Sequence, residues 1–206
     1  MKRNDRLCPL EAALLIALSI TLLTGELAQV RQAALSRQLV RLHVIAASDS
    51  AEAQAVKLMV RDAVLETLTP SLDGASNAGE ALEVLASELD TVAHIASEVS
   101  GEQVRVTLGQ EVYPTREYDT FSLPAGKYAS LRIELGAAEG HNWWCVVYPP
   151  LCTAVAAEDL QSVSGLSRED VRLITEDGEG YVLRFRVMEW WNALLNSPAG
   201  KSENNL

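Results

Sequence analysis

The side chains that most often perform chemistry in proteins are few in this sequence. Its three histidines, His43, His94 and His141, lie far apart, and none forms a metal-like pair with cysteine or carboxylate at helical spacing. The sequence also lacks the glycine loops that bind phosphate, the Gly-x-Ser-x-Gly turn of hydrolases and the His-Glu-x-x-His zinc motif. We therefore predict no catalytic residue, no metal site and no cofactor.

One cysteine could serve as a nucleophile, because Cys145 follows His141 by four residues. A strand would place both side chains on one face but about 13 Å apart, at roughly 3.3 Å per residue. This pair cannot act alone. A thiol or peptide hydrolase is therefore the alternative to a protein without catalysis.

Cys145 and Cys152 are more informative as a pair, since they bracket Pro149 and Pro150. If the chain reverses between them, they reach disulfide distance, and such bonds persist in exported proteins. Closing this short loop would stabilise the fold by about 2 to 3 kcal/mol. We expect this disulfide; two free thiols are the alternative.

A second group of side chains is suited to binding a protein partner. Aromatic and arginine side chains supply much of the energy at protein interfaces. We expect this surface to consist of an exposed loop from Tyr113 to Tyr118 and of one exposed member of the pair Trp143 and Trp144. In the alternative, Arg116 pairs with Glu117 or Glu111 and the tyrosines fill the edge of the core. The candidate residues are Tyr113, Pro114, Thr115, Arg116, Glu117, Tyr118, Trp143 and Trp144.

Residues 1–26 have the order of an export signal. Lys2, Arg3 and Arg6 precede the apolar run AALLIALSITLL. The run is shorter than the roughly 20 residues of a membrane span, which favours a signal peptide. No clear cleavage site follows it, so a signal-anchor remains the alternative. If the segment is cleaved, we expect the mature N-terminus between Gly25 and Ser36, and in either case the rest of the chain is extracytoplasmic.

The remaining chain is predicted to form a helical stalk over residues 27–38, one α+β domain over 39–196 and a disordered tail over 197–206. Alternating apolar residues predict strands at 39–47, 103–108 and 131–135. The segment GHNWWCVVYPPLC is also predicted to begin as a strand, which Pro149 and Pro150 stop because they lack backbone donors. The strands should form a mainly antiparallel or mixed sheet. A short helix is expected near Ser167, and a strand passing into a helix at 181–195.

Two longer helices are predicted between the first and second strands. Asp49 and Glu52 have the spacing of a capping box, which starts the first helix, and Pro70 lies beyond its expected end. The second helix should run from Glu80 to Ser100, after a surface loop. Its apolar residues recur every three or four positions, which is usually core packing; a coiled-coil partner is the alternative.

The charge of the chain limits its partners. Seventeen basic and 28 acidic residues give a formal net charge of -11, which repels nucleic-acid phosphates. The same charge opposes attachment of the body of the protein to an anionic membrane surface. We therefore expect no nucleic-acid binding, and membrane contact only through the N-terminal segment.

Four blocks of sequence together resemble one known family. They are RLHVIAASDS, VKLMVRDAVLE, YPTREYDTFSLPAGKYASLRI and NWWCVVYPPLC, and they extend from about Leu39 to Cys152. In combination they are similar to the stage II sporulation protein R family of endospore-forming bacteria.

This resemblance implies a noncatalytic signalling protein, made in the forespore and exported into the space between the forespore and mother-cell membranes. There it would be needed to activate a membrane-embedded aspartic protease that processes the sigma-E precursor in the mother cell. The alternatives are an extracytoplasmic thiol or peptide hydrolase and a structural cell-envelope module.

Overall fold

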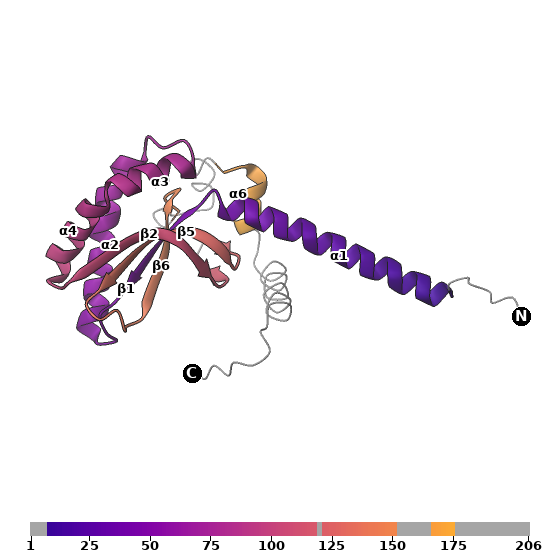
Figure 1. Ribbon diagram of the computed structural model, residues 1–206, viewed down its shortest axis with the longest axis horizontal. Helices are drawn as coiled ribbons and strands as arrows, with labels where there is room; N and C mark the ends of the chain where they lie inside the picture. Colours follow the sequence, from indigo (N-terminus) through magenta and orange to yellow (C-terminus); the bar gives the residue numbers. More distant parts are fainter. Residues whose placement is uncertain (1–7, 119–120, 152–165, 176–206) are drawn as a thin grey trace, which may run out of the picture.

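A mixed four-stranded sheet, in the order β2-β5-β1-β6, organises the protein (Figure 1). The computed structural model describes residues 8–118, 121–151 and 166–175. Strand β1 (Val40–Ile45) runs parallel to β5 (Gly126–Leu135) and antiparallel to β6 (Asn142–Tyr148). Strand β2 (Val104–Tyr113) is antiparallel to β5 at one edge. The strands expected before residue 150 and the α+β class are confirmed.

Three helices cover one face of the sheet (Figure 1): α2 (Ala51–Leu72), α3 (Ala78–Ser87) and α4 (Leu89–Ser100). Their apolar side chains pack against inward-facing residues of the strands and form the main core. The periodic residues of α3 and α4 belong to this core, so the core-packing interpretation is confirmed. Its fully buried members include Leu42, Val44, Val60, Val64, Leu68, Leu85, Ala96, Leu131 and Ile133.

The ends of α2 differ from the prediction. Its N-cap is Ser50, whose side chain accepts a hydrogen bond from the backbone N–H of Ala53, and not Asp49. Asp49 instead accepts a hydrogen bond from the backbone N–H of His141 at 2.7 Å. Pro70 lies inside the helix, in its last turn. Leu72, two residues later, is buried in the core. The stabilisation from this packing outweighs the loss of the backbone hydrogen bond that proline cannot donate.

The single helix predicted from Glu80 to Ser100 is wrong, because the chain breaks it into α3 and α4 at Glu88. The backbone N–H of Glu88 bonds to the carbonyls of both Val84 and Leu85, and its dihedral angles leave the helical region. The break turns the axis without interrupting the spacing of the apolar residues. Periodicity alone therefore could not detect it.

Opposite α2, α3 and α4, one end of the sheet carries a second core. The last turn of α1 (Pro9–Ser36), the hairpin of β3 (Arg116–Glu117) and β4 (Ser122–Leu123), and α6 (Arg168–Thr175) pack there. The short helix expected near Ser167 is α6, and Ser167 caps it by accepting a hydrogen bond from the N–H of Asp170. The loop from Tyr113 to Tyr118 was expected to be exposed. Tyr113 is only 2% exposed and belongs to the second core, so that expectation is wrong for this residue.

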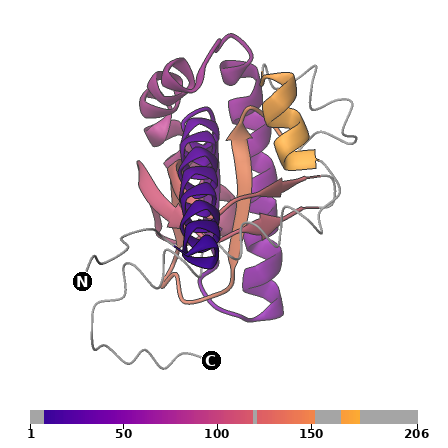
Figure 2. The same cartoon turned by 90° about the vertical axis from the view of Figure 1, so that its right-hand side faces the viewer.

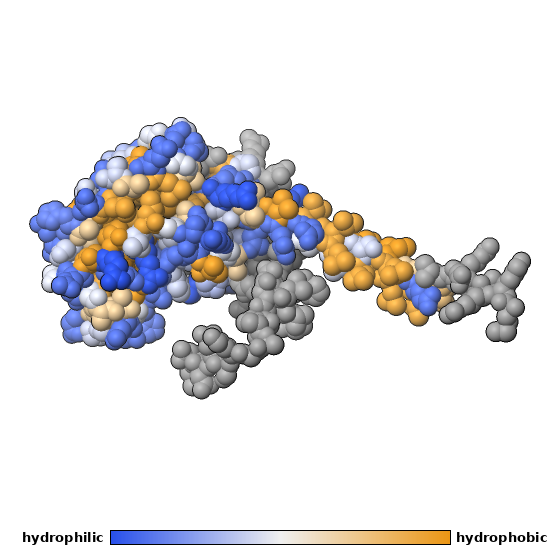
Figure 3. Space-filling view, viewed as in Figure 1, coloured by the Kyte–Doolittle hydropathy of each residue, from blue (hydrophilic) through white to orange (hydrophobic). Residues whose placement is uncertain are grey.

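The N-terminal helix α1 (Pro9–Ser36) is continuous, and it joins the expected export segment to the expected stalk. It projects from the sheet (Figure 1). Its apolar side chains are exposed (Figure 3). Figure 2 shows it end-on in front of the strands, with α6 to one side. Among the described helices it alone is long and apolar enough to cross a membrane, a property that signal sequences share. Residues 181–195 and 197–206, predicted as a final element and a tail, lie outside the described residues.

Candidate partner-binding face

The face of the sheet opposite α2, α3 and α4 carries the chemically distinctive side chains, and we call it the polar face. The strand register aligns His43 of β1 with Arg132 of β5 on one side and with Trp144 of β6 on the other. These side chains share a face because residues in register on neighbouring strands point the same way. A polar row therefore crosses the middle of the sheet.

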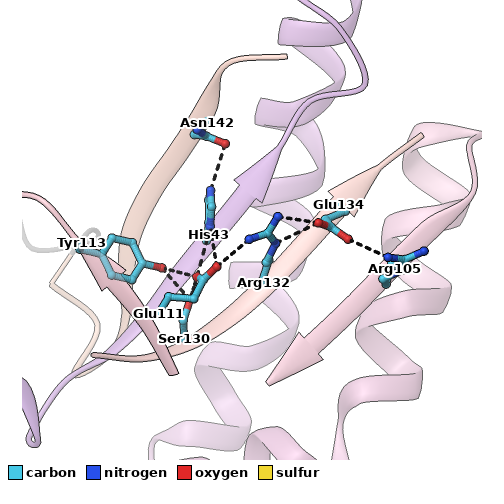
Figure 4. A network of polar contacts seen from close by, with 8 residues as sticks. All are labelled: His43, Arg105, Glu111, Tyr113, Ser130, Arg132, Glu134 and Asn142. Carbon is cyan, nitrogen blue, oxygen red and sulfur yellow. Dashed lines mark hydrogen bonds and ion pairs between the residues drawn. The ribbon is translucent and has the colours of Figure 1, made fainter. Parts of the chain in front are cut away.

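Glu111 of β2 is the centre of a hydrogen-bond network on this face (Figure 4). Its carboxylate accepts hydrogen bonds from the hydroxyls of Ser130 at 2.6 Å and Tyr113 at 2.9 Å. Arg132 donates to it at 2.9 Å, and Nδ1 of His43 lies 3.2 Å away. The acceptor atoms of this partly buried carboxylate are thus held by groups from three strands.

The environment of Glu111 favours its ionised form. Burial acts to raise the pKa, but the hydrogen bonds from Ser130, Arg132 and Tyr113, together with the charge of His43, outweigh it and lower the pKa to about 2. Glu111 therefore stays negatively charged across the physiological range. It serves here to fix the positions of its neighbours, because its oxygens are already occupied.

The network continues toward the edge of the sheet. Arg132 also donates to Glu134 at 2.6 Å, and Arg105 of β2 lies 3.7 Å from the other oxygen of Glu134. On the opposite side, Nε2 of His43 lies 3.0 Å from the side-chain oxygen of Asn142. Polar and charged groups thus form one continuous network from β2 to β6.

A buried arginine lies beside the network. The side chain of Arg41 is 0% exposed, and its guanidinium lies 4.1 Å from the ring centre of Tyr113 and 5.2 Å from that of Tyr128. One nitrogen donates to the hydroxyl of Tyr118. No described residue accepts a hydrogen bond from its Nε or Nη1. The tyrosine rings therefore stabilise this cation through their π faces.

Arg116 forms a second cation–π contact, at the border of the polar face. Its guanidinium lies 3.7 Å from the ring centre of Trp144, and the side chain is half-buried. Among the described residues it forms no ion pair with Glu117 or Glu111, so the pairing considered as an alternative is wrong. Glu111 has Arg132 as its partner instead.

The two tryptophans lie on opposite faces, as predicted. Trp144 packs against the second core, whereas Trp143 is 37% exposed beside α2, where Arg61 lies 4.5 Å from its ring centre. The structure thus brings Arg116 and Trp144 together and separates Trp143 from them. Of the other candidates, Pro114 and Glu117 are exposed, while Thr115 and Tyr118 are half-buried.

The cysteine and histidine candidates do not form a catalytic group among the described residues. Cys145 is 1% exposed and lies in the main core, so its sulfur does not face a substrate. His141 is exposed and contacts Asp49, and His94 is exposed with Glu98 3.6 Å away. Within residues 8–118, 121–151 and 166–175, no group of three His, Cys, Asp or Glu side chains could hold a metal ion.

The predicted disulfide involves Cys152, which lies outside the described residues. We expect mass spectrometry of the exported chain, alkylated without reductant, to find one modified thiol, at Cys8, if the N-terminal segment is retained. It should find none if that segment is removed. Reduction should then expose two more thiols. Alkylation of Cys145 and Cys152 in folded, unreduced protein would contradict the bond.

Sequence reasoning missed Glu111, Ser130 and Arg41. A usable signal was present, because the polar residues of β2 and β5 alternate with apolar ones and so must share one face. Arg41 gave a further signal as a cation in an otherwise apolar strand. The cross-strand register, which sequence alone does not fix, was needed to place these residues together.

Comparison with known proteins shows the family to which the chain belongs. The family model of stage II sporulation protein R matches residues 36–158, more than half of the chain. Stage II sporulation protein R of Bacillus subtilis (strain 168) is 36% identical over 120 residues, which are 56% of this chain and 54% of that protein. The match thus spans about half the length of this curated relative. No solved structure matches the chain.

Proposed function

The chain belongs to the stage II sporulation protein R family, and we propose that it is an exported, noncatalytic sporulation signal. In this proposal it is made in the forespore and acts between the forespore and mother-cell membranes. Its partner is the membrane-embedded aspartic protease that processes the sigma-E precursor in the mother cell. Signalling requires only that the folded domain bind and activate that protease.

The observation that carries the proposal is the position of the family match on the structure. Residues 36–158 begin at the last residue of α1 and include the whole sheet, its three covering helices and the polar face. The apolar part of α1 lies before the match and has the length and composition of a membrane segment. A folded domain delivered by an apolar helix is the arrangement that an exported signal needs.

The border of the polar face offers the best contact for a protein partner. Arg116 and Trp144 are the residue types that dominate binding hot spots, and they are stacked on each other before any partner arrives. Such preorganisation reduces the entropy lost on binding. Arg116 presents a cation at this border, although the whole chain is acidic. We therefore propose that the partner presents an acidic segment.

The test is complementation in sporulating cells that lack their own family member. We expect expression of the full chain in the forespore to restore processing of the sigma-E precursor, measured by immunoblotting. A matched version lacking residues 8–24, which keeps the domain in the forespore, should not restore it. Unchanged processing with a stable, exported full chain would contradict the proposal and favour a structural envelope module. Turnover of a peptide by the purified chain would favour a hydrolase.

A further inference from the structure

The apolar helix joins the domain without a flexible linker. Leu35, in the last turn of α1, is 0% exposed in the second core, and the side-chain amide of Gln32 donates to the carbonyl of Ala125. Only three residues, Arg37 to Leu39, separate α1 from β1. The direction in which the helix leaves the domain is therefore fixed by packing.

The length of α1 determines which residues would meet lipid. From Leu10 to Leu27 the helix rises about 26 Å, close to the roughly 30 Å of a bilayer's hydrocarbon core, and the two charged residues of this stretch, Glu11 and Glu26, lie next to its ends. The hydroxyls of Ser19, Thr21 and Thr24 in this stretch donate to backbone carbonyls of the preceding turn, which lowers the cost of placing them in lipid. With this stretch in a membrane, the following turns of α1 lie among the lipid head groups.

A groove of about 440 Å³ lies at that level, between α1 and the ends of β2 and β5. Its polar lining comprises Gln29, Gln32 and Ser36 of α1, Arg37 directly after that helix, Gln110 of β2 and Lys127 of β5, and includes no carboxylate of a described residue. The hydroxyl of Ser36 already donates to the carbonyl of Ala33, but the amide and cationic groups can donate the hydrogen bonds that a phosphate accepts. In the part of the chain that the structure describes, neither Arg37 nor Lys127 forms an ion pair.

An exposed apolar side chain adjoins the groove. Val112 lies opposite Lys127 in the register of β2 and β5 and is 80% exposed. A valine this exposed beside a cation suits the boundary between head groups and acyl chains, where apolar and charged side chains are both accommodated. The groove thus combines hydrogen-bond donors for a lipid phosphate with an apolar contact for the acyl chains of the same lipid.

From this arrangement we propose that the groove binds the phosphate of an anionic phospholipid, in the leaflet from which α1 emerges. The net charge of the chain opposes such binding, but the local lining is cationic, and charge interactions fall off within about a Debye length. The bound head group would hold the domain at a fixed height and rotation above the membrane. This inference goes beyond signalling and does not depend on it.

The experiment is native mass spectrometry of the full chain in detergent, with phosphatidylglycerol or phosphatidylcholine added. We expect phosphatidylglycerol to be retained preferentially. Arg37→Gln together with Lys127→Gln should weaken its retention by roughly tenfold or more, because each cation near an anionic lipid contributes about a fivefold effect. Arg37→Lys together with Lys127→Arg should retain most of the binding.

The matched control is Arg31→Gln, on the same helix but outside the lining of the groove. It should bind phosphatidylglycerol as the unmodified chain does, and circular dichroism should show that all variants are folded. If Arg31→Gln lost as much phosphatidylglycerol binding as the double glutamine variant, surface charge alone would attract the lipid, and the proposed site would be overturned. Equal retention of both lipids would overturn it too. Displacement of the lipid by millimolar inorganic phosphate would assign the groove to free anions instead.

Discussion

Glu111→Gln is expected to lower the thermal unfolding midpoint of the full chain in detergent by about 5 °C. The substitution removes a charge that accepts hydrogen bonds from Ser130, Tyr113 and Arg132. Loss of charge-assisted hydrogen bonds at a partly buried site costs about 2 kcal/mol, and each kcal/mol shifts the midpoint of a chain of this size by about 2–4 °C. Differential scanning fluorimetry at neutral pH measures the shift.

The same substitution should change the response to acid. The pKa of Glu111 falls from 4.5 in the unfolded chain to about 2 in the folded protein. Its contribution to stability is therefore complete above pH 4.5 and is lost as the pH falls from 4.5 toward 2. The unmodified chain should lose more stability across this window than Glu111→Gln.

Glu98→Gln is the control for both measurements, since it removes the same charge from an exposed helix position. An exposed pair contributes about 0 to 1 kcal/mol, so this variant should unfold close to the unmodified chain. If Glu111→Gln behaves like Glu98→Gln at neutral pH and in acid, the Glu111 network does not stabilise the sheet.

The strands were predictable because their physical cause is local. The side chains of β1, β2 and β5 alternate between the main core and the opposite face, which leaves a period of two in the sequence, whereas β6 is marked by a continuous apolar run that two prolines end. Helix ends were less predictable. Pro70 is retained inside α2 because residues around it are buried, and burial depends on tertiary contacts that the helix sequence does not contain.

The candidate site was predictable only in part, because buried polar residues depend on distant partners. Tyr113 was expected at the surface on account of its polar neighbours, yet it is buried against Arg41 and Ser130, which come from other strands. The opposite faces of Trp143 and Trp144 could be predicted, since neighbouring strand residues alternate. The stacking of Arg116 on Trp144 could not, because it joins segments almost thirty residues apart.

The effect of largest expected size is the loss of signalling in Arg116→Ala. This change removes the half-buried cation of the cation–π pair with Trp144, which we propose as the contact for the protease. Truncating a hot-spot arginine costs 2 kcal/mol or more of binding energy, about a thirtyfold loss of affinity or greater. Processing of the sigma-E precursor in the complementation assay should therefore fall at least tenfold.

Stability separates this interpretation from a structural one. A half-exposed cation–π pair contributes about 0.5–1 kcal/mol, so the unfolding midpoint of Arg116→Ala should fall by only about 2 °C. Arg61→Ala is the matched control, because Arg61 forms the same kind of pair with Trp143 beside α2, on the other face of the sheet. Arg61→Ala should lose as little stability as Arg116→Ala and should signal normally. If Arg116→Ala signals normally, or both variants fail alike, the partner does not bind at the border of the polar face.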